Sequence, residues 1–147
     1  MRYALLFLLI VSVLTGCITG RVTGRVTDDY KAQSLAADPP EGMGRITVFI
    51  NSRPNRGGYY VFVAAYSGFV SRDSYTVFDL PPGTYRVYVG NLSTDVPLRA
   101  GEERAVLYRN WQKGVRPIGL ITPESAEWYR ERFDMVWNSS LPESAKR

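Results

Sequence analysis

Alternating apolar and polar positions dominate the chain from residue 45 onward and predict β-strands. In the stretch 46–50, the aliphatic residues Ile46, Val48 and Ile50 recur at every second position and therefore share one face. Six further stretches have the character of strands, by alternation or by a continuous apolar run: 59–66, 74–80, 85–89, 96–98, 103–108 and 114–121. Segments rich in glycine, proline and asparagine separate them. About seven short strands with turn signals between them predict an antiparallel β-sandwich, a mainly β fold.

The pattern also predicts which side chains face the core. The stretch 59–66 is apolar on both faces, which predicts a strand covered on both sides. In 85–89, we expect Tyr85, Val87 and Val89 to point inward. In 103–108, Val106 and Tyr108 share one face of the predicted strand.

The sequence Leu80-Pro81-Pro82-Gly83-Thr84-Tyr85 lies between two of these predicted strands. Pro82-Gly83 suits the centre of a type II turn, with glycine at the place that requires positive φ. This pattern predicts a β-hairpin between 74–80 and 85–89. The phrase resembles the hairpin of transthyretin-like and carboxypeptidase-regulatory β-sandwich domains, and the resemblance implies the architecture of those domains.

The hydrophobic period changes after Thr122. Thr122, Pro123 and Glu124 have the chemistry of an N-cap, a first helical residue and an acid in the first turn. Apolar residues then recur at helical spacing: Ala126, Tyr129, Phe133, Val136 and Trp137. We expect one C-terminal α-helix that packs on the sandwich or covers an open edge.

At the N-terminus, an apolar run over 4–13 ends in Leu14-Thr15-Gly16-Cys17. This phrase resembles the lipobox of bacterial lipoproteins. The resemblance implies a signal peptide, helical in its apolar part, that is cut between Gly16 and Cys17. Cys17 then carries the lipid that attaches the protein to a membrane. The apolar run is shorter than the roughly 20 residues of a membrane-spanning helix, which favours a cleaved signal.

These patterns divide the chain into four parts. We expect a signal peptide over 1–16, a lipidated cysteine and tether over 17–43, a β-sandwich with its helix over 44–137, and a flexible tail over 138–147. Pro39 and Pro40 interrupt regular structure in the tether, which has room for a turn of helix near residues 31–36.

Composition narrows the chemistry. The chain has 18 basic and 14 acidic residues, so without Arg2 of the signal it keeps 17 basic residues and a net charge of +3. The basic residues are scattered, which argues against a nucleic-acid partner. There is no histidine and only one cysteine, so the commonest general base and metal ligand are missing. We therefore expect no enzymatic role, no metal and no cofactor.

Three acidic groups leave an alternative open, a carboxylate-dependent hydrolase of envelope material. They are Asp28-Asp29, Glu102-Glu103 and the set Glu124, Glu127 and Glu131. Solvated structural roles account for all three groups, and we favour these roles over catalysis.

Ten tyrosines and three tryptophans exceed what one sandwich core needs. Exposed aromatic side chains favour a surface that receives a partner protein or stacks on sugar rings. The candidate binding residues are Tyr59, Tyr60, Tyr88 and Trp111, and the expected partner is an envelope protein or a glycan. Ordinary packing between strands and helix is the other interpretation.

A second resemblance covers about 44–121. The lipobox, a tether with prolines, the opening strand 44–50, the Pro-Pro-Gly phrase and the Ala100-Gly101-Glu102 turn are together similar to small bacterial lipoproteins with an uncharacterised β-domain. It carries no catalytic residue across. It implies a lipid-anchored binding or assembly accessory of the cell envelope. Ile18, a residue other than aspartate after the cysteine, implies the outer membrane, with the domain facing the periplasm.

Overall fold

The computed structural model describes residues 24–53, 57–111 and 117–147. These ranges contain two α-helices, nine β-strands and a short 3₁₀ segment at Glu143–Ala145. In chain order the main elements are α2 (Asp28–Ala36), β1 (Gly44–Asn51), β2 (Gly58–Val63), β3 (Tyr66–Ser71), β4 (Ser74–Leu80), β5 (Gly83–Val89), β6 (Leu92–Leu98), β7 (Glu103–Arg109), β8 (Ile118–Ile121), α3 (Pro123–Arg132) and β9 (Asp134–Met135).

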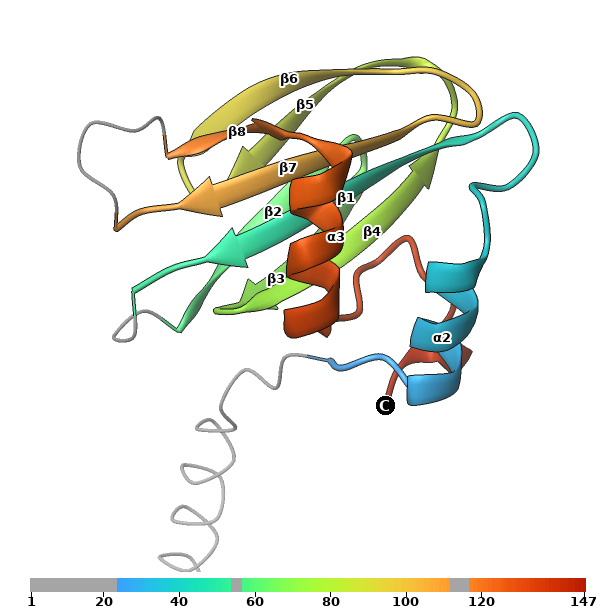
Figure 1. The fold of residues 1–147 in the computed structure, drawn as a ribbon, viewed down its shortest axis with the longest axis horizontal. Helices are drawn as coiled ribbons and strands as arrows, with labels where there is room; N and C mark the ends of the chain where they lie inside the picture. Colours follow the sequence, from blue (N-terminus) through green and yellow to red (C-terminus); the bar gives the residue numbers. More distant parts are fainter. Residues whose placement is uncertain (1–23, 54–56, 112–116) are drawn as a thin grey trace, which may run out of the picture.

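The strands form two sheets that pack face to face, which confirms the predicted mainly β sandwich. One sheet has the order β8-β7-β1-β4-β9, and the other has the order β3-β2-β5-β6. The helices lie on the outer side of the five-stranded sheet, and α3 crosses in front of β7, β1 and β4 (Figure 1). The molecule therefore has three layers: a four-stranded sheet, a five-stranded sheet and helices.

The central strand β1 is buried on both faces because each face has its own covering layer. Ile46, Val48 and Ile50 are fully buried between the two sheets, as predicted from their spacing. Phe49 points the other way and packs against Tyr129 of α3, with a ring-centroid distance of 5.5 Å. Burial of both faces of one strand gives the fold two hydrophobic cores that share a sheet.

Helix α3 begins as the sequence predicts but ends earlier. The side chain of Thr122 accepts a hydrogen bond from the backbone of Ser125, and Pro123 occupies the first turn. The helix stops at Arg132, so the predicted helical positions of Val136 and Trp137 are wrong. The backbone of 134–136 joins the edge of the five-stranded sheet, where the Val136 amide donates to Tyr75 O at 2.8 Å. This pairing satisfies backbone hydrogen-bonding groups at the edge of β4, which a longer helix would leave unpaired.

The predicted hairpin at Pro82-Gly83 is wrong. Strand β4 belongs to the five-stranded sheet and β5 to the four-stranded sheet, so 81–82 is a crossing between layers. Gly83 is absent from the described glycines with positive φ and is the first residue of β5. The two prolines lack amide hydrogens and end the β4 ladder. Tyr85 closes the crossing, because its hydroxyl donates to Pro81 O at 2.7 Å.

The segments before and after the predicted domain pack onto it. The expected tether contains α2, and Val26 is buried in the hydrophobic core between the five-stranded sheet and α3. The C-terminal segment is not a loose tail, because Asn138 and Ala145 are 0% and 1% exposed. The first described segment also pairs with the C-terminal one: Thr27 N donates to Ala145 O at 2.9 Å, and Arg147 N donates to Arg25 O at 2.7 Å. The compact unit therefore begins near Gly24 and reaches residue 147.

The predicted signal helix, the cleavage site at Gly16 and the lipidation site at Cys17 lie outside the described residues. Within the ranges that the structure describes, neither helix has the length and hydropathy that a membrane crossing requires.

Asn138 fastens the C-terminal segment, so Asn138→Ala should destabilise the fold. Its amide donates to Thr76 Oγ1 at 2.6 Å and to Val77 O at 2.7 Å, and its carbonyl oxygen accepts from Ser140 N at 2.7 Å. We expect a loss of about 1–3 kcal/mol in the free energy of unfolding, because buried polar partners are left unsatisfied. Urea denaturation is the measurement, and the exposed Glu143→Ala is the control. Equal stability of the two variants would mean that the segment contributes little.

Tyr75 should make the fold sensitive to alkaline pH. It is fully buried, its hydroxyl has no hydrogen-bond partner among the described residues, and burial raises its pKa to about 12 from an ordinary value of 10.0. The stabilisation is complete below pH 10 and is lost as pH rises toward 12, since only the unfolded chain releases this proton. At about 1.4 kcal/mol per pH unit, the loss is on the order of 2–3 kcal/mol.

The variant Tyr75→Phe should lack this part of the alkaline loss. It should also be as stable as the natural protein at pH 7 or more stable, because it removes an unpaired buried hydroxyl. Denaturation midpoints measured from pH 8 to 12 test both expectations. Parallel pH curves for the two proteins would contradict them.

Candidate functional site

The outer side of the four-stranded sheet carries a cluster of aromatic side chains. Successive residues of a strand point to opposite sides, so Val61 and Val63 of β2 enter the core while Tyr60 and Phe62 point outward. The register places Phe69 of β3 opposite Tyr60 and Tyr88 of β5 opposite Phe62. The sheet therefore gathers four rings from three strands. We call Tyr60, Phe62, Phe69 and Tyr88 the aromatic face.

The rings of the aromatic face contact one another and remain open to solvent. Tyr60 meets Phe69 edge-on with centroids 5.2 Å apart, and it stacks on Phe62 at 6.2 Å. Tyr60, Phe62 and Tyr88 are 43%, 45% and 43% exposed. The prediction that residues 59–66 form one strand covered on both faces is therefore wrong. The stretch divides between β2 and β3, and one of its two sides faces water.

One ion pair borders the aromatic face. Arg86 and Asp95 stand opposite each other on β5 and β6, and Arg86 Nε donates to Asp95 Oδ1 at 2.7 Å. Hydrogen bonds to Asp95 and the charge of its carboxylate raise the pKa of Arg86, and a hydrogen bond to Tyr88 adds to this effect. The hydrogen bonds from Arg86 in turn lower the pKa of Asp95. This side of the sheet is thus aromatic over β2 and β3 and polar toward β6.

The structure brings together two of the four predicted binding residues, Tyr60 and Tyr88. Tyr59 points inward, where its ring lies 4.6 Å from that of Tyr108 and its hydroxyl accepts from Asn110 at 2.7 Å. Trp111 lies beyond the end of β7, and its indole nitrogen donates to Asn51 Oδ1 at 3.2 Å. Sequence reasoning missed Phe62 and Phe69. The alternation within 59–63 would have separated Tyr60 and Phe62 from Tyr59, whereas Phe69 follows only from strand register.

A charged cluster lies on the opposite side of the molecule, between the five-stranded sheet and α2. Arg45 is 8% exposed and donates from Nε and Nη2 to the two carboxylate oxygens of Asp79, at 2.7 and 3.0 Å. Its Nη1 donates to the carbonyl oxygens of Ser34 and Ala37 at the end of α2. Burial lowers the pKa of Arg45, but the hydrogen bonds and charge of Asp79 outweigh it, so the pKa lies above its ordinary value. Arg45 therefore fixes α2 to the sheet.

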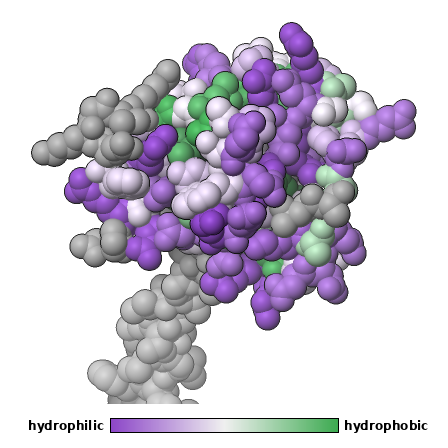
Figure 2. All heavy atoms as spheres, in the orientation of Figure 1, coloured by the Kyte–Doolittle hydropathy of each residue, from purple (hydrophilic) through white to green (hydrophobic). Residues whose placement is uncertain are grey.

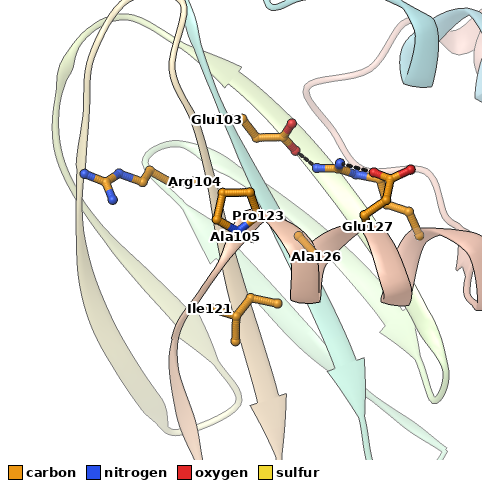
Figure 3. Close-up of a pocket in the computed structure, with 8 residues that line it drawn as sticks. Glu103, Arg104, Ala105, Ile121, Pro123, Ala126 and Glu127 are labelled. Carbon is orange, nitrogen blue, oxygen red and sulfur yellow. Dashed lines mark hydrogen bonds and ion pairs between the residues drawn. The ribbon is translucent and has the colours of Figure 1, made fainter.

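Glu103 connects this cluster to α3. It accepts a hydrogen bond from Thr47 Oγ1 at 2.7 Å and pairs with Arg130, which also pairs with Glu127 at 3.2 Å. Glu103 and Arg130 line two cavities, of about 230 and 170 Å³. Figure 3 shows the larger one, with Glu103 and Glu127 directed at the same guanidinium. Both carboxylates thus share one cation instead of converging on open space.

The other predicted acidic groups are also dispersed. Glu102 and Glu103 have different partners: Glu102 pairs with Arg104 at 2.9 Å, and Glu103 pairs with Arg130. Asp28 and Asp29 lie in the first turn of α2. A hydrogen bond from its own amide, and one from Thr122, lower the pKa of Glu124 at the start of α3. Among the described residues, no group of three or more histidine, cysteine, aspartate and glutamate side chains is arranged to hold a metal ion.

The helical side of the molecule is mainly hydrophilic (Figure 2).

Comparisons with known proteins add little. No family model matches the chain, and no curated protein matches it. Among solved structures, the N-terminal domain of AlgF from P. aeruginosa is similar, with 22% identity and a TM-score of 0.41. The match covers 56% of this chain and 94% of that domain. A likeness of this extent carries no argument about function, and the resemblance to transthyretin-like domains stays a prediction.

Two bidentate arginine–aspartate pairs in one chain allow a matched test of burial. Arg45→Ala should lower the free energy of unfolding by about 2–4 kcal/mol, because it leaves Asp79 and the carbonyl oxygens of Ser34 and Ala37 without their donor. Arg86→Ala removes an equally short pair at the surface and should have little effect, since water replaces it. Chemical denaturation measures both. Equal losses would contradict the role assigned to Arg45.

Proposed function

We propose that this protein is a lipid-anchored lipoprotein of the bacterial envelope that acts as a non-catalytic binding or assembly accessory. Cys17 carries the anchor, the sandwich is a rigid platform, and the aromatic face is the interaction surface. The proposed location is the outer membrane, with the domain on the periplasmic side.

The observation that carries the proposal is the exposed aromatic face itself. Three of its four side chains are more than 40% exposed, although tyrosine and phenylalanine side chains are usually largely buried. Clustered exposed aromatics of this kind mark interaction surfaces. Their strands are held in place by a valine-rich core, so the face is rigid before it meets a partner.

The alternative of a carboxylate-dependent hydrolase would use the cavities beside Glu103. An enzyme needs a concave pocket in which free polar groups converge. Here Glu103 and Glu127 are both paired with Arg130, and the two cavities beside Glu103 measure only about 230 and 170 Å³. Hydrolysis of envelope material by the purified protein, abolished by Glu103→Gln, would favour the alternative over our proposal.

The anchor is tested at Cys17. Cells grown with a fatty-acid analogue should label the natural protein but not Cys17→Ser, because the thioether to lipid needs the cysteine sulfur. The variant should also keep its signal peptide, because we expect cleavage before residue 17 to depend on the cysteine. A matched control is Ser12→Ala, which keeps the cysteine and the apolar run and should still be labelled. Label that persists on Cys17→Ser would overturn the lipoprotein proposal.

A further inference from the structure

The β2–β3 hairpin lacks charge over an unusual length. Residues 57–71 are fifteen consecutive positions without Asp, Glu, Lys or Arg, whereas the next longest such segments in the described part of the chain cover eight. The hairpin nevertheless lies at the surface: Phe62 and Tyr66 are 45% and 37% exposed, and Ala64 and Ala65 at its turn are exposed as well. Because surface hairpins usually carry charges, this one is suited to a poorly hydrated partner.

The hairpin lies close to the point where the chain leads back toward Cys17. Gly24 is the first described residue, and its carbonyl oxygen accepts from the amide of Trp137. The neighbouring Asn138 sits so close to Gly68 of β3 that a Cβ on this glycine would lie 2.8 Å from Asn138 Cβ. Ser139 N then donates to Ser67 O at 2.8 Å. Two short contacts thus connect the exit point to the edge of the hairpin.

The chain between the anchor and the domain is short. Gly24 is seven residues after Cys17, so even a fully extended chain spans at most about 25 Å. That distance is below the roughly 30 Å thickness of a bilayer's hydrocarbon core. A lipid on Cys17 therefore keeps the exit side of the domain at the membrane surface at all times. The effective concentration of bilayer at the hairpin is accordingly high.

The chemistry of the hairpin matches the membrane–water interface. Tyrosine is enriched there because an apolar ring with one polar end suits the headgroup region. Phenylalanine contributes buried apolar area. An uncharged segment avoids the cost of placing an ionised group in that layer. The polar Arg86–Asp95 pair lies toward β6, away from β3.

We propose that the β2–β3 hairpin and the aromatic face dock on the lipid bilayer to which Cys17 is anchored. This inference rests on the lipid anchor of the proposed function and names the partner of its interaction surface. Docking orients the domain, because the four-stranded sheet faces the lipid and the helical layer faces the aqueous side (Figure 1). Trp128, which is 50% exposed on α3, and the cavities beside Glu103 then remain accessible to a soluble assembly partner.

The unique cysteine makes the orientation measurable in the full, acylated protein. Cys17 is the only cysteine and its sulfur is consumed by the lipid, so Ala65→Cys introduces a single reactive thiol at the hairpin turn. Glu131→Cys on α3 is the matched control, since it is also exposed. Each variant is labelled with an environment-sensitive fluorophore and reconstituted in phosphatidylethanolamine–phosphatidylglycerol vesicles. Quenchers on the lipid chains and aqueous iodide report where each label lies.

We expect lipid-chain quenchers to reduce the signal at position 65 several-fold more than at position 131, and iodide to show the reverse order. Higher salt should not change this pattern, because no charge on the hairpin is screened. Adding Phe62→Ser and Tyr66→Ser to the Ala65→Cys variant should return the label to water while the anchor persists.

Three outcomes overturn the proposal. The label at 65 responds to iodide as strongly as the label at 131, or it is shielded from iodide without lipid quenching, or its shielding depends on protein density in the vesicles. The second outcome indicates a protein or glycan partner, and the third a second copy of the chain. The mass of the N-terminal peptide reports acylation separately. An unacylated peptide would contradict the proposed function, and this is known before the docking result is interpreted.

Discussion

The structure depends on one constraint: the five-stranded sheet has two apolar faces, and both must be covered. β1 shows this constraint most directly. Ile46, Val48 and Ile50 lie on one of its faces and Phe49 on the other, and all four are fully buried. The second sheet covers the first side. The other side needs α3, and also the segments at both ends of the chain, which contribute Val26 and Leu141 to the same core. The cost of leaving such surface in water, about 25 cal/mol per Å², explains why the segments that carry Val26 and Leu141 pack as parts of the domain.

The four-stranded sheet follows a different rule, because only one of its faces is covered. Antiparallel sheets tolerate one solvated face, and that face is normally polar. Here β5 and β6 follow the norm with Arg86 and Asp95, whereas β2 and β3 do not. The departure is local and costs solubility without adding to the core. The core does not explain this departure, and we propose the lipid bilayer at an anchored Cys17 as its functional reason.

Sequence reasoning recovered what depends on periodicity and missed what depends on pairing. The inward positions of β5 and the residues that share a face in β1 and β7 were predicted from alternation. The start of α3 was predicted from the capping chemistry of Thr122 and Pro123. Pro82-Gly83 was misread because a turn signal does not say whether the next strand stays in the same sheet. The end of α3 was misread because Val136 fits a helical stripe and a sheet edge equally well. The aromatic face was half recovered, since Phe69 reaches Tyr60 only through the β2–β3 register.

The parallel pairing of β1 with β7 has a consequence for the order of events during folding. The first strand of the sandwich is also its central one, and one neighbour, β7, begins more than fifty residues later, at Glu103. The first described residues wait longer still, because Thr27 and Arg25 bond to Ala145 and Arg147. Contacts of such long sequence separation slow folding. A chain that emerges from a ribosome or a translocation channel N-terminus first therefore has no complete sheet until most of it is free. The topology itself delays compaction, so the polypeptide can still pass through a narrow channel in an unfolded state until its last residues emerge.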